Sequence, residues 1–433
     1  MTSSTSADLV IIGAGILGCA VAARASAVGL STVVVDRLGA AGRGSTGSSA
    51  GIVRVHAEDV PGSIMADESL PAWTHWREFA EVPGDRPAAR FVQCGTLILD
   101  GDSPFAARVT QVMRSARVAY DVLDADQVRG AWPDLDISLF GGPFAADDPR
   151  FWEAEGRPLR ASIHTPSTGY VGDPALAAQN LLDQAQARGA RFMRGRSVTG
   201  IQRHGSALSA VLLDDGTRIP TGAALDAAGP ESMGLLHAMG ADADFTVRTR
   251  PVREELHHIP LDPDSSLARS GLHLVDSDLG ANWRTDGSAV LAGSNGAACD
   301  PLEVLTDPNA FSVEPTPAAW ERSVLRVARR VPGMGVPSRV QGLAGVYDVT
   351  DDWIPIYDRT EVAGLFVALG TSGNQFKTAP VVAEFLVEMI RRGFDGVDQD
   401  ANPLRYIAPG TGRAIDTSFF SRRRTPHISG GRG

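Results

Sequence analysis

The chain has 433 residues, of which 43% are hydrophobic and 21% charged, and its formal net charge is −11. A chain of this length is expected to fold into more than one domain. Nucleic-acid binding draws its affinity from basic surfaces, so the acidic balance argues against that function, and no apolar stretch reaches the roughly 20 residues that span a bilayer.

The first predicted elements form a β-α-β unit at the N-terminal end. Residues 8–12 (DLVII) are a short β-branched run typical of a buried parallel strand. Residues 19–26 follow a glycine-rich turn with small side chains that suit a helix packed on a sheet, and residues 31–36 give the next strand. This order predicts a parallel sheet with crossover helices.

The turn between the first strand and helix carries the pattern GxGxxG at residues 13–18. A glycine at the first position permits a tight turn, the second lets the backbone approach a pyrophosphate, and the third lets helix and strand pack closely. The helix N-terminus attracts phosphate, and a carboxylate at the end of the next strand accepts ribose hydroxyls. We therefore predict a dinucleotide site, with these residues binding: Gly13, Gly15, Ile16, Leu17, Gly18, Asp36 and Arg37.

Further elements follow in the second half of the chain. Residues 173–187 are a predicted helix with Asp173 as its N-cap, and residues 191–226 contain short strands and the turn Asp214-Asp215-Gly216. A strand over residues 364–368 leads through a glycine turn to a helix over residues 379–392. Residues 91–99 are also strand-like.

The fold class predicted from these elements is α/β. A Rossmann-type nucleotide-binding domain with βαβ units is expected from residues 1–80, 165–240 and 340–412. An interleaved α+β substrate domain with an antiparallel sheet is expected from residues 81–164 and 241–339. Residues 413–433 form a predicted, loosely held C-terminal tail.

From residue 8 to about residue 393 the chain resembles the D-amino-acid oxidase superfamily of flavoproteins. Within that superfamily it is most similar to the branch of sarcosine oxidase, dimethylglycine dehydrogenase and glycine oxidase. Six strings carry the resemblance: GAGILG at 13–18, GSTGSSAG at 44–51, FVQCGTLIL at 91–99, TGYVGDP at 168–174, DAAGPES at 226–232 and GLFVALGTSGNQFKTAP at 364–380.

The resemblance implies FAD as the cofactor. It places three serines near the pyrophosphate and flavin, the Val198 backbone at the adenine and Gly229 beside the cofactor. Relatives attach the flavin through a cysteine where Gly345 stands, or through a histidine that residues 47–51 lack, so we expect FAD to be non-covalent. The remaining implied contacts are Ser45, Ser48 and Ser49, and, at the pyrimidine end of the flavin, Gly370, Ser372, Gly373, Asn374 and Lys377.

The resemblance also implies active-site residues. Lys377 and Arg54 are expected to hold a substrate carboxylate, with His56 and Tyr347 nearby and Asp348 as a candidate amine contact. Surface positions for Lys377, Arg54 and His56, and an ordinary core position for Tyr347, remain alternatives. The adjacent histidines 257 and 258 face opposite sides of a strand, so we predict no metal site.

The expected function is FAD-dependent oxidation of the C–N bond of an amino acid or a secondary or N-methyl amine to an imine, with O2 as acceptor and H2O2 as product. The alternatives are a 2-hydroxy-acid oxidase or dehydrogenase, a flavin subunit of a multimeric amine dehydrogenase, and a flavin monooxygenase reduced by NAD(P)H. Three cysteines and no signal-peptide pattern favour a cytoplasmic protein, expected to be a monomer or small homo-oligomer without nucleic-acid or membrane partners.

Overall fold

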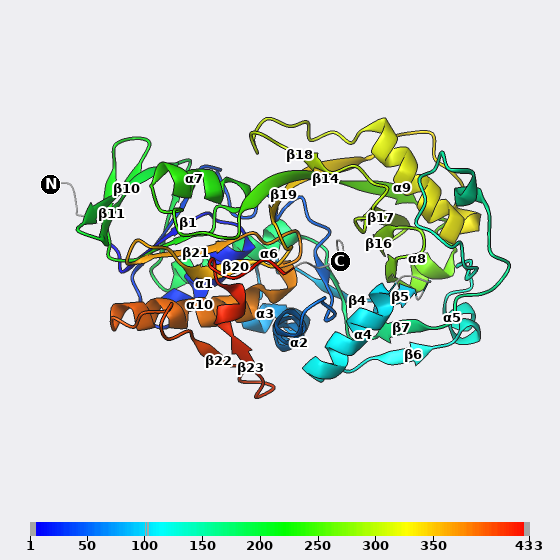
Figure 1. Ribbon diagram of the computed structural model, residues 1–433, viewed down its shortest axis with the longest axis horizontal. Coiled ribbons are helices and arrows are strands. Elements are labelled where there is room, and N and C mark those ends of the chain that lie inside the picture. The colour runs from blue at the N-terminus through cyan, green and yellow to red at the C-terminus, as the bar shows by residue number, and fades with distance from the viewer. Residues whose placement is uncertain (1–5, 100, 102–103, 428–433) are drawn as a thin grey trace.

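Two large sheets organise the chain in the computed structural model, which describes residues 6–99, 101 and 104–427 (Figure 1). The six-stranded sheet has the order β20-β21-β13-β1-β2-β9. Its strands are parallel except β20, which pairs antiparallel with β21. They are β1 (Leu9–Ile12), β2 (Thr32–Asp36), β9 (Arg191–Arg194), β13 (Ala224–Asp226), β20 (Ile356–Arg359) and β21 (Leu365–Leu369).

Both faces of this sheet are covered, which explains its nearly continuous apolar strands. Leu9 and Ile11 of β1 pack in one core with α1 (Ile16–Ala27), α6 (Pro174–Ala187) and α10 (Ala379–Phe394). The alternate residues Val10 and Ile12 pack in a second core, against the elements that cover the other face. These are β10 (Val198–His204), β11 (Ala207–Leu213), β12 (Arg218–Pro220) and α7 (Ser232–Ala238).

The predicted β-α-β unit is confirmed as β1, α1 and β2. The predicted helix at residues 173–187 is also confirmed, and the Asp173 side chain caps α6 by accepting from the N–H of Leu176 at 2.9 Å. The predicted turn at residues 214–216 connects β11 to β12, where Gly216 has a φ of +82°.

The second sheet has nine strands and forms the other part of the molecule with α5, α8 and α9 (Figure 1). Its order is β18-β14-β17-β16-β15-β5-β7-β6, with β19 also paired to β14. All its pairs are antiparallel except β15 with β5. The strands are β5 (Thr96–Leu99), β6 (Asp121–Leu123), β7 (Ser162–Thr165), β14 (Thr249–Pro260), β15 (His273–Asp276), β16 (Ala281–Thr285), β17 (Ala289–Ser294), β18 (Glu303–Val304) and β19 (Gly342–Thr350).

One strand crosses the predicted domain boundary. The expected range 340–412 assigns β19 to the nucleotide-binding domain, yet β19 pairs with β14 over residues 342–350. Figure 1 shows this long pair running between the two parts of the molecule. The strand pair therefore brings residues from both predicted domains into one wall.

The strand-like run at residues 91–99 forms two strands rather than one. Gly95 has a φ of +73°, and the chain turns there between β4 (Phe91–Gln93) and β5, which belong to different sheets. The remaining elements are α2 (Val60–Thr74), α3 (Trp76–Phe79), α4 (Phe105–Ala116), α5 (Ala125–Ala131), α8 (Ser266–Ser270), α9 (Pro317–Arg330), β3 (Ile52–Val53), β8 (Gly169–Val171), β22 (Arg405–Ile407) and β23 (Ala414–Asp416).

The expectation of a loosely held C-terminal tail is also wrong for residues 413–427; residues 428–433 lie outside the described residues. Arg422 is fully buried and pairs with Asp244 at 2.6 Å, Asp358 at 3.0 Å and Asp400 at 2.8 Å. Arginine can satisfy several carboxylates at once through its forked guanidinium, so these contacts anchor the segment.

Candidate active site

The glycine-rich turn has a geometry that only glycine permits at two positions. Gly13 has a φ of +103°, and a Cβ there would lie 2.4 Å from the Ala227 carbonyl oxygen. A Cβ on Gly18 would lie 2.0 Å from the Gly13 carbonyl oxygen. The turn therefore packs directly on the segment after β13, as the close helix–strand packing of a dinucleotide fold requires.

The N-terminus of α1 is suited to a phosphate. Its N-cap is Gly15, which has no side chain to cap the helix. The Ile16 N–H donates to Thr46 Oγ1 at 3.1 Å, a contact that brings the small-residue segment of residues 44–51 to this turn. Thr46 was not among the predicted residues, although it lies inside a string that carries the resemblance.

Asp36 lies at the end of β2, beside the glycine turn. Its carboxylate accepts from the N–H of Ala14 and from that of Leu38, each at 2.7 Å. A carboxylate in this place can accept the hydroxyls of an adenosine ribose. The next residue, Arg37, pairs instead with Glu231 at 2.5 Å.

Two other predicted cofactor residues lie around the same edge of the sheet. Val198 begins β10 and is half-buried, and the nearby N–H of Arg196 donates to the Asp36 carbonyl oxygen at 3.1 Å. Gly229 follows β13 with a φ of +66°, and a Cβ there would meet nothing within 4 Å. The glycine turn, the N-terminus of α1, Asp36 and this open edge together fit the adenosine and pyrophosphate parts of FAD.

Two of the three predicted serines, Ser45 and Ser48, lie against β19. Ser45 Oγ donates to the Val346 carbonyl oxygen at 2.6 Å, and Ser49 Oγ donates to the Thr46 carbonyl oxygen at 2.8 Å. A Cβ on Gly345 would lie 2.8 Å from the Cβ of Ser48. The position where relatives carry a flavin-attaching cysteine therefore has no room for a side chain in this chain.

The loop after β21 is held in an unusual backbone conformation. Gly370, Ser372 and Gly373 have φ angles of +67°, +49° and +69°. Asp348 stabilises this conformation, since its carboxylate accepts from the Gly370 N–H at 2.5 Å and its carbonyl oxygen accepts from the Ser372 N–H at 2.8 Å. A non-glycine residue with positive φ, such as Ser372, is a mark of a constrained functional loop.

Asp348 is not the amine contact that we expected. Its side chain is 2% exposed and lies outside the described walls of the cavity. Burial raises its pKa to about 7, because the charged form loses its hydration. The carboxyl group supports the loop rather than a substrate.

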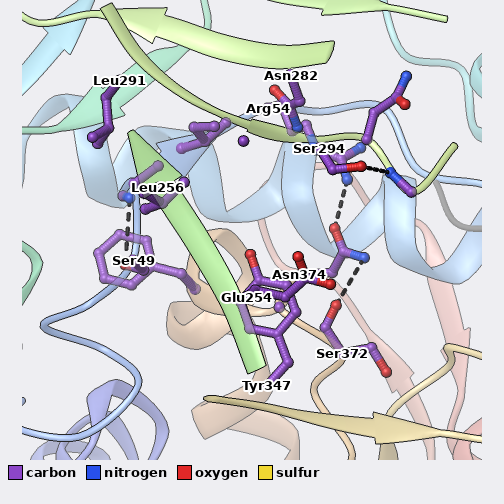
Figure 2. A pocket seen from close by; sticks show the side chains of 18 of the residues that line it. Ser49, Arg54, Glu254, Leu256, Asn282, Leu291, Ser294, Tyr347, Ser372 and Asn374 are labelled. Carbon is purple, nitrogen blue, oxygen red and sulfur yellow. Dashed lines mark hydrogen bonds between the residues drawn. The ribbon is translucent and has the colours of Figure 1, made fainter. Parts of the chain in front are cut away.

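A cavity of about 110 Å³ lies between the segment around β3, the loop after β21 and the strands β14, β16 and β17 (Figure 2). Its walls include the predicted residues Ser49, Arg54, Tyr347, Ser372, Gly373, Asn374 and Lys377. They also include Ile52, Glu254, Leu256, Asn282, Leu291, Ser294, Asn295, Trp353 and Phe376. Residues from four distant parts of the sequence thus meet here.

Arg54 and Lys377 are buried cations in the walls of this cavity, and only 9% and 4% of their surfaces are exposed. Arg54 donates to the His56 carbonyl oxygen at 2.8 Å and to Asn374 Oδ1 at 2.5 Å, a bond drawn in Figure 2. Lys377 Nζ donates to the Asn374 carbonyl oxygen at 2.5 Å. Asn374 therefore joins the two cations.

Burial shifts the pKa of both groups. Loss of hydration lowers the pKa of Arg54 to about 10 and that of Lys377 well below its usual value, and the nearby Arg54 charge lowers the Lys377 pKa further. Asp59 acts in the opposite direction on Lys377. A bound anion would stabilise the charged forms of both side chains.

Tyr347 lines the cavity, but the structure places His56 elsewhere. The Tyr347 ring packs against Gly373, where an added Cβ would lie 2.3 Å from the ring. His56 lines a second cavity of about 180 Å³ on the other side of Arg54 and Lys377. It is 1% exposed, and burial holds its pKa well below the usual value, so its imidazole is neutral.

Sequence reasoning missed the wall formed by the nine-stranded sheet. Glu254, Asn282 and Asn295 reach the cavity because β14, β16 and the end of β17 lie side by side. No motif marks these positions, since they lie in the inserted segments rather than in a string shared with relatives. Side chains alternate between the two faces of a sheet, but which face lines the cavity can be told only once the pairing and register of the strands are known.

Within the described part of the chain, no cluster of three or more histidine, cysteine or acidic side chains could hold a metal ion. His257 is 2% exposed and its Nε2 contacts Glu255 at 3.0 Å, while the adjacent His258 is half-buried. Among the same described residues, no helix is both long and apolar enough to cross a bilayer.

Comparisons with known proteins agree with this geometry. The family model described as FAD dependent oxidoreductase (DAO) matches residues 8–389. A D-amino acid dehydrogenase of Cereibacter sphaeroides is 25% identical over 314 residues, which cover 70% of this chain and 62% of the relative. The chain thus matches less than two thirds of that relative's length.

Solved structures share the fold at lower identity. L-proline dehydrogenase from P. horikoshii superposes with a TM-score of 0.75 at 18% identity, covering 97% of each chain. Glycine oxidase from Geobacillus kaustophilus gives a TM-score of 0.71 at 18% identity, covering 98% of this chain and all of that one. At such identities the likeness establishes the fold.

Proposed function

The chain belongs to the DAO family of FAD-dependent oxidoreductases, and we propose that it oxidises the C–N bond of an amino acid, or of a secondary or N-methyl amine, to an imine. The names of its relatives support this substrate class, since they include a D-amino acid dehydrogenase and a glycine oxidase. When bound, FAD supplies the two-electron oxidation, and we propose O2 as the final acceptor with H2O2 as product.

The observation that carries the proposal is the pair of buried cations in one cavity wall. Arg54 and Lys377 are joined through Asn374 and have lost most of their hydration. A substrate carboxylate would replace that hydration with charge-assisted hydrogen bonds. We propose that Arg54 binds the substrate carboxylate and that Lys377 adds positive charge to the same wall of the cavity.

The role of these side chains is to position the substrate. A carboxylate held at Arg54 fixes the adjacent carbon relative to the loop of Gly370 to Asn374, where the flavin would bind. Because Tyr347 is buried and its pKa is raised by burial, its hydroxyl stays protonated and can donate a hydrogen bond but not remove a proton. A neutral substrate amine needs no side-chain base.

We propose that FAD is bound non-covalently, because Gly345 and residues 47–51 offer no attachment group. A cytoplasmic location and a monomeric or small homo-oligomeric state also remain proposals. The cation pair would equally hold the carboxylate of a 2-hydroxy acid, which is the main alternative substrate. A flavin subunit of a multimeric amine dehydrogenase is the other alternative.

The test is anaerobic reduction of the purified flavoprotein, followed by the absorbance of oxidised flavin. Candidate reductants are sarcosine, D- and L-amino acids, 2-hydroxy acids and NADPH. We expect bleaching by amino acids or secondary amines, with the Arg54→Gln variant needing at least about tenfold more substrate. Bleaching only by a hydroxy acid or only by NADPH would reject the proposal in favour of that alternative.

A further inference from the structure

Polar side chains of the nine-stranded sheet form a further wall of the cavity: Glu254 of β14 and Asn282 of β16, both labelled in Figure 2, and Asn295 after β17. The proposed oxidation assigns no role to these side chains. Their hydrogen-bonding partners determine which atoms they can present to a ligand. A chain of buried groups behind Asn282 makes that assignment possible.

This series of hydrogen-bonded groups begins at Thr168, which is fully buried. Its hydroxyl donates to the Thr165 carbonyl oxygen at 2.7 Å, and this uses its single proton. Thr96 Oγ1 lies 2.7 Å from Thr168 Oγ1. Thr96 must therefore be the donor in that pair, and its own proton is used as well.

The next link is His273, whose Nδ1 lies 2.9 Å from Thr96 Oγ1. Since Thr96 has no proton left for this bond, the histidine must donate from Nδ1. His273 is fully buried, and loss of hydration lowers its pKa to about 3, so it carries only that one ring proton at neutral pH. Its Nε2 must then accept a hydrogen bond.

The atom 2.8 Å from His273 Nε2 is Asn282 Oδ1, which cannot donate to an unprotonated ring nitrogen, so the two ends of this amide must be exchanged. Only the NH2 of that amide can donate, so the nitrogen belongs on the histidine side. The two ends of an amide are assigned from their hydrogen bonds, and here the bonds decide the orientation. The oxygen of Asn282 is thereby left as the end that can face the cavity.

The rest of the wall has the same character. Asn295 Nδ2 donates to the Asp276 carbonyl oxygen at 3.1 Å, which leaves its oxygen as an acceptor. The Ser294 hydroxyl donates to Asp300 and accepts from the Gly296 N–H, so its proton is not available to a ligand. Glu254 adds a carboxylate close to Tyr347. Burial raises the pKa of the Tyr347 hydroxyl, and the charge of Glu254 raises it further.

Resting on the proposed function, we propose that this acceptor wall binds a cationic nitrogen group of the substrate. The preferred substrates are then amino acids whose side chain ends in an ammonium or guanidinium group, with the carboxylate at Arg54. Donors of this kind complement a carboxylate and two amide oxygens, whereas an anionic side chain would be repelled by Glu254.

The first test separates binding from turnover. The holoenzyme is titrated with 5-aminovalerate and with valerate, which share a carboxylate but differ in the terminal ammonium, and the flavin absorbance is followed. We expect 5-aminovalerate to bind about tenfold more tightly, and this preference to disappear in Glu254→Gln and in Asn282→Leu. Glu303→Gln, an exposed change on the same sheet, is the control that should keep it.

The second test compares turnover of ornithine and lysine with that of norleucine and glutamate, using both enantiomers. Lower KM values for the two cationic amino acids support the inference. Equal or lower KM values for norleucine, together with equal binding of valerate, overturn it while leaving the proposed function intact. If no amino acid, secondary amine or N-methyl amine reduces the flavin, the proposed function itself fails, and the wall has no such substrate to select.

Discussion

Replacement of Arg424 should destabilise the protein strongly and also weaken substrate binding. Its guanidinium donates to both oxygens of Asp352 at 2.8 and 2.9 Å, to the Ile354 carbonyl oxygen at 2.6 Å and to that of Pro355 at 3.1 Å. These bonds hold the turn that carries Trp353, a residue with a φ of +63° that lines both cavities.

The expected magnitude follows from burial. The Arg424 and Asp352 side chains are 5% and 0% exposed, and removing one partner of such a pair leaves an unpaired buried charge. We expect Arg424→Met to lower the free energy of unfolding by about 3–5 kcal/mol. Arg423 pairs with Asp244 at 2.6 Å but is 48% exposed, so Arg423→Met should cost no more than about 1 kcal/mol.

The assay is urea denaturation of both variants, followed by tryptophan fluorescence, with KM measured on the folded fraction. The Arg424 variant should also show a raised KM, because Trp353 loses its support, and the Arg423 variant should not. Equal losses of stability in the two variants would refute the claim that the C-terminal segment is anchored through buried pairs. An unchanged KM in the Arg424 variant would refute its link to the cavity.

Three further predictions concern the glycine loops and a buried acid. Gly13→Ala should purify without flavin, because its Cβ would lie 2.4 Å from the Ala227 carbonyl oxygen. The ratio of flavin to protein absorbance measures this, and a normal flavin content would contradict it. Gly373→Ala should raise KM at least about tenfold, since its Cβ would displace the Tyr347 ring, and unchanged kinetics would show that the loop adapts. Burial raises the pKa of Asp348 from 3.8 to about 7, so the unfolded chain loses its proton first as the pH rises. Between pH 4 and 7 the free energy of unfolding of the wild type should therefore fall by up to about 4 kcal/mol relative to that of Asp348→Asn, as measured by urea denaturation. A difference between the two proteins that does not change with pH would contradict the raised pKa.

The nucleotide-binding half could be predicted because its constraints are local. The GxGxxG turn, Asp36 at a strand end and Asp173 at a helix start each depend on a few adjacent residues. The order of these elements then predicted the parallel sheet, and the resemblance to the family implied FAD as the cofactor. The cations Arg54 and Lys377, 323 residues apart, were expected together only through the family strings.

The substrate wall could not be predicted because it depends on strand pairing. Glu254 faces the cavity since β14 pairs with both β17 and β19, and a shift of one residue would turn it to the other side. The tail was misjudged for a similar reason. Its arginines have the composition of a solvated end, and their carboxylate partners lie 22 to 346 residues away.

The most direct test of the account is the stoichiometry of one anaerobic turnover. Limiting amounts of an amino acid are added to the oxidised flavoprotein, and the bleached flavin is compared with the 2-oxo acid formed when the imine hydrolyses. The account predicts one 2-oxo acid for each flavin reduced, with the yield lost in Arg54→Gln at the same substrate concentration. Flavin that stays oxidised with every amino acid and every secondary or N-methyl amine, or is reduced without formation of the carbonyl product of imine hydrolysis, would contradict it.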